Sequence, residues 1–149
     1  MIRVQTDDFD LGAEYAAFAA GNADVGAIAA FIGRVRANSD GAALRAMTLE
    51  HYPGMTEKEL ERIEAEARKR WPLIDVTIIH RTGRLLPNDQ IVLVLTASAH
   101  REAAFDAARF LMDFLKTRAP FWKQEETAEG TRWVAAKDAD DRAADKWAG

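Results

Sequence analysis

The sequence contains no cysteine. Without cysteine the chain has no disulfide, no thiolate nucleophile and no sulfur ligand for a metal ion. Its three histidines, His51, His80 and His100, also lack the spacing of metal ligands, so we predict neither a metal site nor a bound cofactor. We interpret His80 as a hydrogen-bonded structural residue. If the protein takes part in sulfur chemistry, another molecule must supply the sulfur.

Long apolar runs and an excess of positive charge are absent as well. No run approaches the about 18 apolar residues of a membrane-spanning helix, and the N-terminal segment MIRVQTDDFD lacks the apolar core of a signal peptide. We therefore expect a cytoplasmic protein with no membrane contact. Lys and Arg number 20 against 24 Asp and Glu, a formal net charge of −4, which argues against nucleic acid as a partner.

The chain is long enough for one domain. Its 149 residues, 48% of them hydrophobic and 30% charged, can bury a single core without disulfides. The segment NSDG at residues 38–41 has the composition of a turn or mobile loop. Apolar segments with an alternating or continuous pattern predict strands at residues 25–36, 44–52, 76–79, 91–97 and 131–135. We predict a single-domain α+β fold with a mixed sheet over residues 1–149.

Apolar residues spaced three and four apart predict helices between these strands. Thr56, with Glu59 three residues later, forms a capping box that would begin one helix. Ser98 is expected to cap another, whose apolar stripe includes Phe105 and faces the core. Residues 138–147 have the pattern of a terminal amphipathic helix.

Two pairs of basic residues are candidates for binding an anion. His100 and Arg101 stand at the start of a predicted helix, beside the free amide groups of its first turn. The alternative is that both are solvated residues of that turn, and the local pattern does not choose between these interpretations. Arg34 and Arg36 share one face of a predicted strand. They could clamp a phosphate, or they could form a charged strand end that discourages edge pairing.

Two lysines, Lys116 and Lys123, flank the apolar block Ala-Pro-Phe-Trp in the segment KTRAPFWKQE. Lys116 falls in the last turn of a helix, where a cation also complements the helix dipole without any catalytic role. Lys123 follows Phe121 and Trp122, whose burial would draw its ammonium group away from water. A lysine in such a pocket, beside a second cation, can act as an acid, a base or a nucleophile. A Schiff-base lysine enzyme is therefore one hypothesis.

His100 and Lys116 are too far apart to contact one small ligand from the same chain. They are 16 residues apart, which on one unbroken helix corresponds to about 24 Å at about 1.5 Å per residue. If both serve one ligand, a symmetric dimer must bring the helix start of one subunit to the helix end of the other.

Five motifs together resemble the large, catalytic subunit of molybdopterin synthase. They span most of the chain, from about residue 25 to about residue 135. Their order and spacing are more specific than any single motif. The motifs are FIGRVR (31–36), LEHYPGMTEKEL (49–60), HRTGRL (80–85), SAHREAAF (98–105) and MDFLKTRAPFWKQE (112–125).

The resemblance implies a function in molybdenum cofactor biosynthesis. Members of that family convert cyclic pyranopterin monophosphate (precursor Z) into molybdopterin by inserting two dithiolene sulfurs. Each sulfur arrives as a thiocarboxylate at the Gly-Gly C-terminus of a small ubiquitin-like subunit. The family fold is an α/β hammerhead with an additional antiparallel sheet, and a homodimer of large subunits with a small subunit at each end forms a heterotetramer. The alternative is a non-catalytic binding module for a phosphorylated ligand.

The resemblance also implies roles for individual residues. Lys116 and Lys123 match positions of the chemical step, and Arg36, His100 and Arg101 match substrate-binding or active-site positions. To the substrate-binding group we add Arg34, which shares the face of Arg36, and Lys137, which stands where the family often has arginine. Asn88 departs from the family, which usually has glycine before the aspartate, but asparagine tolerates a positive φ.

Overall fold

The computed structural model describes residues 1–134 and 138–148, of which residues 138 and 139 are described through their backbone alone. The first of its two sheets has the strand order β1-β5-β7-β2. β1 pairs in parallel with β5, whereas the other pairs are antiparallel, so the predicted mixed sheet is confirmed. The strands are β1 (Ile2–Gln5), β5 (Leu73–Arg81), β7 (Gln90–Ser98) and β2 (Ala27–Arg34).

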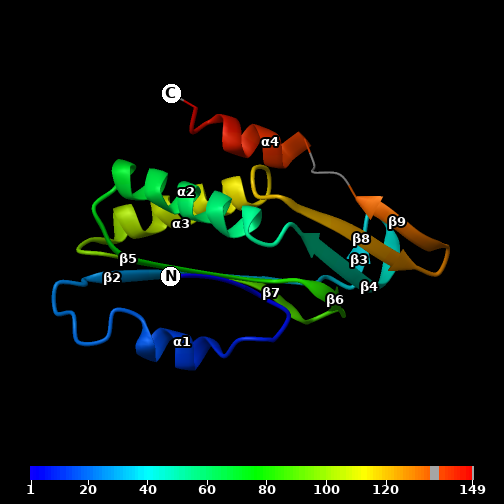
Figure 1. Cartoon of the computed structure of the whole chain (residues 1–149), viewed down its shortest axis with the longest axis horizontal. Helices are drawn as coiled ribbons and strands as arrows, with labels where there is room; N and C mark the ends of the chain where they lie inside the picture. The colour runs from blue at the N-terminus through cyan, green and yellow to red at the C-terminus, as the bar shows by residue number, and fades with distance from the viewer. Residues whose placement is uncertain (135–137, 149) are drawn as a thin grey trace.

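The second sheet is antiparallel and lies toward one end of the molecule (Figure 1). Its strand order is β3-β4-β8-β9, and β6 also pairs with β4. The expected α+β fold with an additional antiparallel sheet is thereby confirmed. The strands are β3 (Asn38–Ser39), β4 (Ala42–His51), β6 (Gly83–Leu85), β8 (Phe121–Thr127) and β9 (Gly130–Val134).

Helices cover both faces of the first sheet. Figure 1 shows α2 (Met55–Arg70) and α3 (Arg101–Leu115) side by side on one face and α1 (Leu11–Ala17) on the other. The terminal helix α4 (Asp138–Asp145) packs on α3, where the Trp147 indole N–H donates to Asp113 Oδ2 at 2.6 Å. The predicted terminal helix is thus present, although it ends before Trp147.

The central strand β7 is buried on both faces, as its continuous apolar sequence predicted. Val92 and Val94 belong to the core cluster that includes residues of α2 and α3. Leu93 and Leu95 point to the opposite face and pack with residues that flank α1. Because side chains alternate along a strand, only a strand covered on both sides can use four apolar residues in a row.

The predicted starts of α2 and α3 were both wrong. Gly54, at φ 86°, precedes α2, and its N–H donates to Glu57 Oε2 at 3.1 Å in place of the predicted capping box of Thr56 and Glu59. Thr56 is buried instead, and its Oγ1 accepts from the Tyr52 N–H. The Ser98 hydroxyl donates to the Pro72 carbonyl at 2.9 Å, so α3 begins after His100 with no side-chain cap.

Of two further predictions, the turn at residues 38–41 is confirmed, and the core position of Phe105 is wrong. The NSDG segment forms the tight turn of the β3–β4 hairpin, in which Asp40 and Gly41 both have positive φ, at 48° and 81°. Two such residues match the twist of paired strands, so the segment is ordered by its hairpin. Phe105 is 64% exposed, because the buried stripe of α3 runs through Ala104, Ala108, Leu111 and Leu115, which leaves Phe105 on a neighbouring face.

Candidate active site

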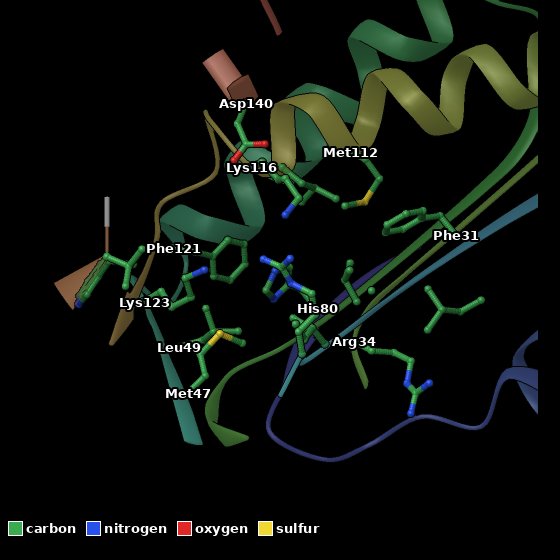
Figure 2. A pocket seen from close by; sticks show the side chains of 18 residues that line it. Phe31, Arg34, Met47, Leu49, His80, Met112, Lys116, Phe121, Lys123 and Asp140 are labelled. Carbon is green, nitrogen blue, oxygen red and sulfur yellow. The ribbon is translucent and has the colours of Figure 1, made fainter. Parts of the chain in front are cut away.

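A pocket of about 670 Å³ opens where the two sheets meet the C-terminal end of α3 (Figure 2). Its walls combine apolar and basic side chains. The apolar ones include Phe31, Ile32, Met47, Leu49, Ile91, Val92, Met112, Leu115 and Phe121. The charged or polar ones include Arg34, Arg36, His80, Lys116, Lys123 and Asp140.

Lys123 reaches the pocket through the pairing of β8 with β4. In this register Lys123 lies opposite Leu49, and Phe121 lies opposite His51. Side chains alternate along a strand, so Phe121 and Lys123 share the pocket face. Trp122 also borders the pocket and packs on Tyr52, with ring centroids 4.7 Å apart. The aromatic block thus holds Lys123 half-buried, as the sequence predicted, although the strand that does so was not predicted.

Lys116 reaches the same pocket from the end of α3. Its N–H donates to the Met112 carbonyl at 3.1 Å, which continues the helical hydrogen bonding by one residue. Its side chain extends into the space that also receives Lys123 (Figure 2). The residues that the structure describes include no hydrogen-bond or ion-pair partner for the Lys116 ammonium. Its positive charge therefore remains available to a ligand.

Arg34 and Arg36 line the pocket together, with the buried Val35 between them. β2 ends at Arg34, and Arg36 lies beyond the strand, but the alternation of side chains persists because the Val35 N–H donates to the Asp89 carbonyl at 2.9 Å. The Arg34 guanidinium donates to the Asn88 carbonyl and Oδ1 at 3.3 Å. Asn88 has φ 78°, so the predicted tolerance of positive φ at this turn is confirmed.

His100 and Arg101 do not line this pocket. Both are exposed at the start of α3, at the opposite end of the 15-residue helix from Lys116. The structure therefore confirms that one chain cannot bring the two ends of the helix to one small ligand. Lys137 lies outside the described residues. The four cations that the single chain does bring together are Arg34, Arg36, Lys116 and Lys123.

His80 is a pocket residue that the sequence analysis did not assign to the site. It is 8% exposed, and its ring stacks on Phe121 with centroids 3.8 Å apart at 15°. Nδ1 lies 2.8 Å from the Arg81 carbonyl, so the predicted structural hydrogen bond is confirmed. Burial, and less strongly the positive charge of Lys116, lowers the pKa of His80 to about 4. The apolar strand before it, which predicts burial, was the available signal.

The site is suited to a ligand that is both anionic and partly apolar. Four cations can hold a phosphate or a carboxylate, while Met47, Leu49 and Phe121 provide a surface for a flat or apolar group. Within residues 1–134 and 138–148 there is no group of three acidic or histidine side chains arranged to hold a metal ion. The same residues contain no helix long and apolar enough to cross a membrane.

Known proteins are similar to this chain in sequence and in fold. The family model described as MoaE protein matches residues 4–118. The molybdopterin synthase catalytic subunit of Ralstonia nicotianae is 58% identical over 146 residues, 98% of this chain and 83% of that protein. The structure of the molybdopterin biosynthesis MoaE protein from Burkholderia ambifaria MC40-6 is 58% identical, with a TM-score of 0.85 over 100% of this chain and 98% of that one.

A more distant structure shares the fold alone. The complex of subunits 1 and 2 of molybdopterin-converting factor from Helicobacter pylori is 19% identical, with a TM-score of 0.72 over 92% of this chain and 90% of that one. The family of this chain is decided by the match to the family model and by the 58% identity to the Ralstonia and Burkholderia proteins over nearly the whole length. The chain belongs to the MoaE family of molybdopterin synthase catalytic subunits, which are enzymes of molybdenum cofactor biosynthesis.

Proposed function

We propose that the protein converts cyclic pyranopterin monophosphate (precursor Z) into molybdopterin by inserting two dithiolene sulfurs. The observation that carries the proposal is the meeting of Lys116 and Lys123, from two different elements, in one pocket with Arg34 and Arg36. The arginines suit the phosphate of the substrate, and the apolar wall suits its ring system. The chain has no sulfur nucleophile, since it contains no cysteine, and therefore needs an external donor.

The donor we propose is the C-terminal Gly-Gly thiocarboxylate of a small ubiquitin-like subunit. Its sulfur bonds to a carbon of the pterin side chain as the bond from that carbon to its oxygen breaks. In one of the two transfers this oxygen stays on the phosphate, whose ring opens, and in the other it leaves as water. Water then attacks the acyl carbon, which releases the donor tail as a carboxylate and leaves the sulfur on the pterin. The Lys116 and Lys123 ammonium groups stabilise the oxyanion formed at the acyl carbon or move the protons. A second donor supplies the second sulfur.

The complete site, in this proposal, uses two copies of the large subunit. His100 and Arg101 of one copy bind the substrate that lies against Lys116 of the other, because a single α3 separates these groups by its whole length. With one small subunit at each end the assembly is a heterotetramer. The proposal places it in the cytoplasm, treats residues 1–149 as one domain, and keeps Lys137 as a substrate-binding candidate.

The test is the formation of molybdopterin from cyclic pyranopterin monophosphate and a thiocarboxylated small subunit. We expect turnover by the wild type and loss of at least about 100-fold in Lys116→Ala and Lys123→Ala, with binding of the small subunit retained. Lys69→Ala, on the exposed last turn of α2, is the matched control and should be fully active. An inactive wild type with a competent donor would contradict the proposed function.

The same variants separate the alternatives. A binding module for a phosphorylated ligand would have no turnover to lose, and Lys116→Ala would change its affinity alone. A Schiff-base enzyme would give a covalent adduct after borohydride treatment, and the absence of such an adduct would dismiss it. Turnover can also be measured after dilution of the large subunit to a monomer. Full activity of the monomer would contradict a site formed by residues of two large subunits.

A further inference from the structure

His80 is held in one tautomer by its surroundings. Nδ1 lies 2.8 Å from the Arg81 carbonyl oxygen, which can only accept a hydrogen bond. Nδ1 therefore carries the proton, and Nε2 carries the free lone pair. The ring is fixed in orientation by its stack on Phe121.

Nε2 is open to a ligand. Within residues 1–134 and 138–148, no side chain or backbone group forms a hydrogen bond with Nε2. Figure 2 shows the His80 side chain in the pocket beside Phe121, in the space that Lys116 and Lys123 enter. A neutral acceptor thus lies among cations, and burial keeps it neutral by lowering its pKa to about 4.

Nε2 of His80 is a hydrogen-bond acceptor in a pocket whose other polar side chains are mostly donors. The basic side chains Arg34, Arg36, Lys116 and Lys123 can only donate hydrogen bonds. Among the described residues that line the pocket, nitrogen or oxygen acceptors on side chains come from His80 and from Asp140 of α4. A ligand held by its phosphate on the cations can therefore be oriented by a separate N–H or O–H group directed at His80.

We propose that His80 is a substrate-orienting residue, whose Nε2 accepts a hydrogen bond from an N–H group of the pterin ring while the basic residues hold the phosphate. This inference rests on the proposed function, since the pterin is its substrate. A pterin carries amide and amine N–H groups, which are the donors that a neutral imidazole accepts from. The flat ring also suits the aromatic surface made by His80 and Phe121.

Calorimetric titration of wild type, His80→Phe and His80→Gln with cyclic pyranopterin monophosphate and with inorganic phosphate tests this assignment. His80→Phe keeps a ring against Phe121 but removes the acceptor, and we expect about tenfold weaker pterin binding with unchanged phosphate binding. His80→Gln places an amide oxygen near the position of Nε2 and should restore most of the loss. In turnover, His80→Phe should raise KM about tenfold and leave kcat within about twofold.

His51→Phe is the matched control, because His51 also faces Phe121, at 6.4 Å between ring centroids, but does not line the pocket. It should bind both ligands as the wild type does. If His80→Phe weakened phosphate and pterin equally, or left pterin affinity unchanged, His80 would be structural and the inference overturned. If the wild type converts the substrate and His80→Phe binds and converts it equally well, the inference about His80 is overturned and the proposed function stands. If the wild type neither binds nor converts the substrate, the proposed function is overturned as well.

Discussion

The two sheets of this protein differ in what their side chains contact. In the first sheet, β7 is buried on both faces, and Val92 to Leu95 contact other apolar side chains. In the second sheet, β8 turns Phe121 and Lys123 toward the pocket and buries the carboxylate of Glu125. The first sheet therefore provides most of the stability, and the second provides charged groups at defined positions. Four changes test this division.

The largest effect is expected in the first sheet. Leu95→Ala removes a fully buried side chain from the centre of β7, and the cavity left behind should lower the free energy of unfolding by about 3 kcal/mol. Leu86→Ala, at a position 47% exposed, should change it by less than about 0.5 kcal/mol. Urea denaturation measures both. Equal losses in the two variants would contradict the assignment of the core to this sheet.

In the second sheet, the buried residue to test is Glu125 on β8, whose side chain is 2% exposed. Its carboxylate accepts from the Ser39 hydroxyl at 2.9 Å and from Arg132 at 3.1 Å, and so connects three strands. Glu125→Ala leaves both donors without this partner, and we expect a loss of about 2 kcal/mol, since Arg132 is still partly solvated.

The neighbouring residue on β8 is the control. Glu126 pairs with Arg84 on the surface, so Glu126→Ala should cost less than about 1 kcal/mol. Amide hydrogen exchange should speed up in β3, β8 and β9 of Glu125→Ala while β7 stays protected. Faster exchange throughout the first sheet would show that the two sheets do not differ in local stability.

The pH dependence of stability tests the boundary between the sheets, where His80 stacks on Phe121. Its pKa is lowered from 6.5 to about 4, so between these values the unfolded chain binds a proton that the folded chain does not. Stability should fall as pH drops through this window, by roughly 1 kcal/mol between about pH 6.5 and 5.5. His80→Phe should lack this part of the slope in urea titrations. An unchanged slope would mean that His80 titrates normally in the folded protein.

The smallest effect is expected at Asn88, whose φ of 78° suits glycine. Asn88→Gly removes the strain of a side chain in the left-handed region but also an acceptor for Arg34, so the free energy of unfolding should stay within about 0.5 kcal/mol of wild type. Asn88→Val, in contrast, should cost more than about 1 kcal/mol, because a β-branched residue resists positive φ. Thermal unfolding compares them, and equal melting temperatures of the two variants would refute the strain argument.

Much of the fold could be predicted from local patterns. The continuous apolar run of β7 and the periodic stripe of α3 identified these elements, because burial demands apolar side chains at a regular spacing. Element starts were less predictable. Thr56 is a residue type that often caps helices, but it lies within the first turn of α2 and is buried, and Ser98 donates to the carbonyl of Pro72. Thr56 accepts from the N–H of Tyr52, four residues earlier, whereas the partner of Ser98 is 26 residues away, which a local pattern does not contain.

The amino-acid sequence by itself determined the kinds of groups available: the missing thiol, the basic residues Arg34, Arg36, Lys116 and Lys123, and the motifs that resemble the family. Only the tertiary structure decided which groups meet. The pairing of β8 with β4 turned Lys123 toward Lys116, and the burial of His80 against Phe121 made a neutral acceptor beside them. The physical reason is that composition and spacing act along the chain, whereas strand register, burial and pKa depend on neighbours that are distant in sequence and adjacent in space.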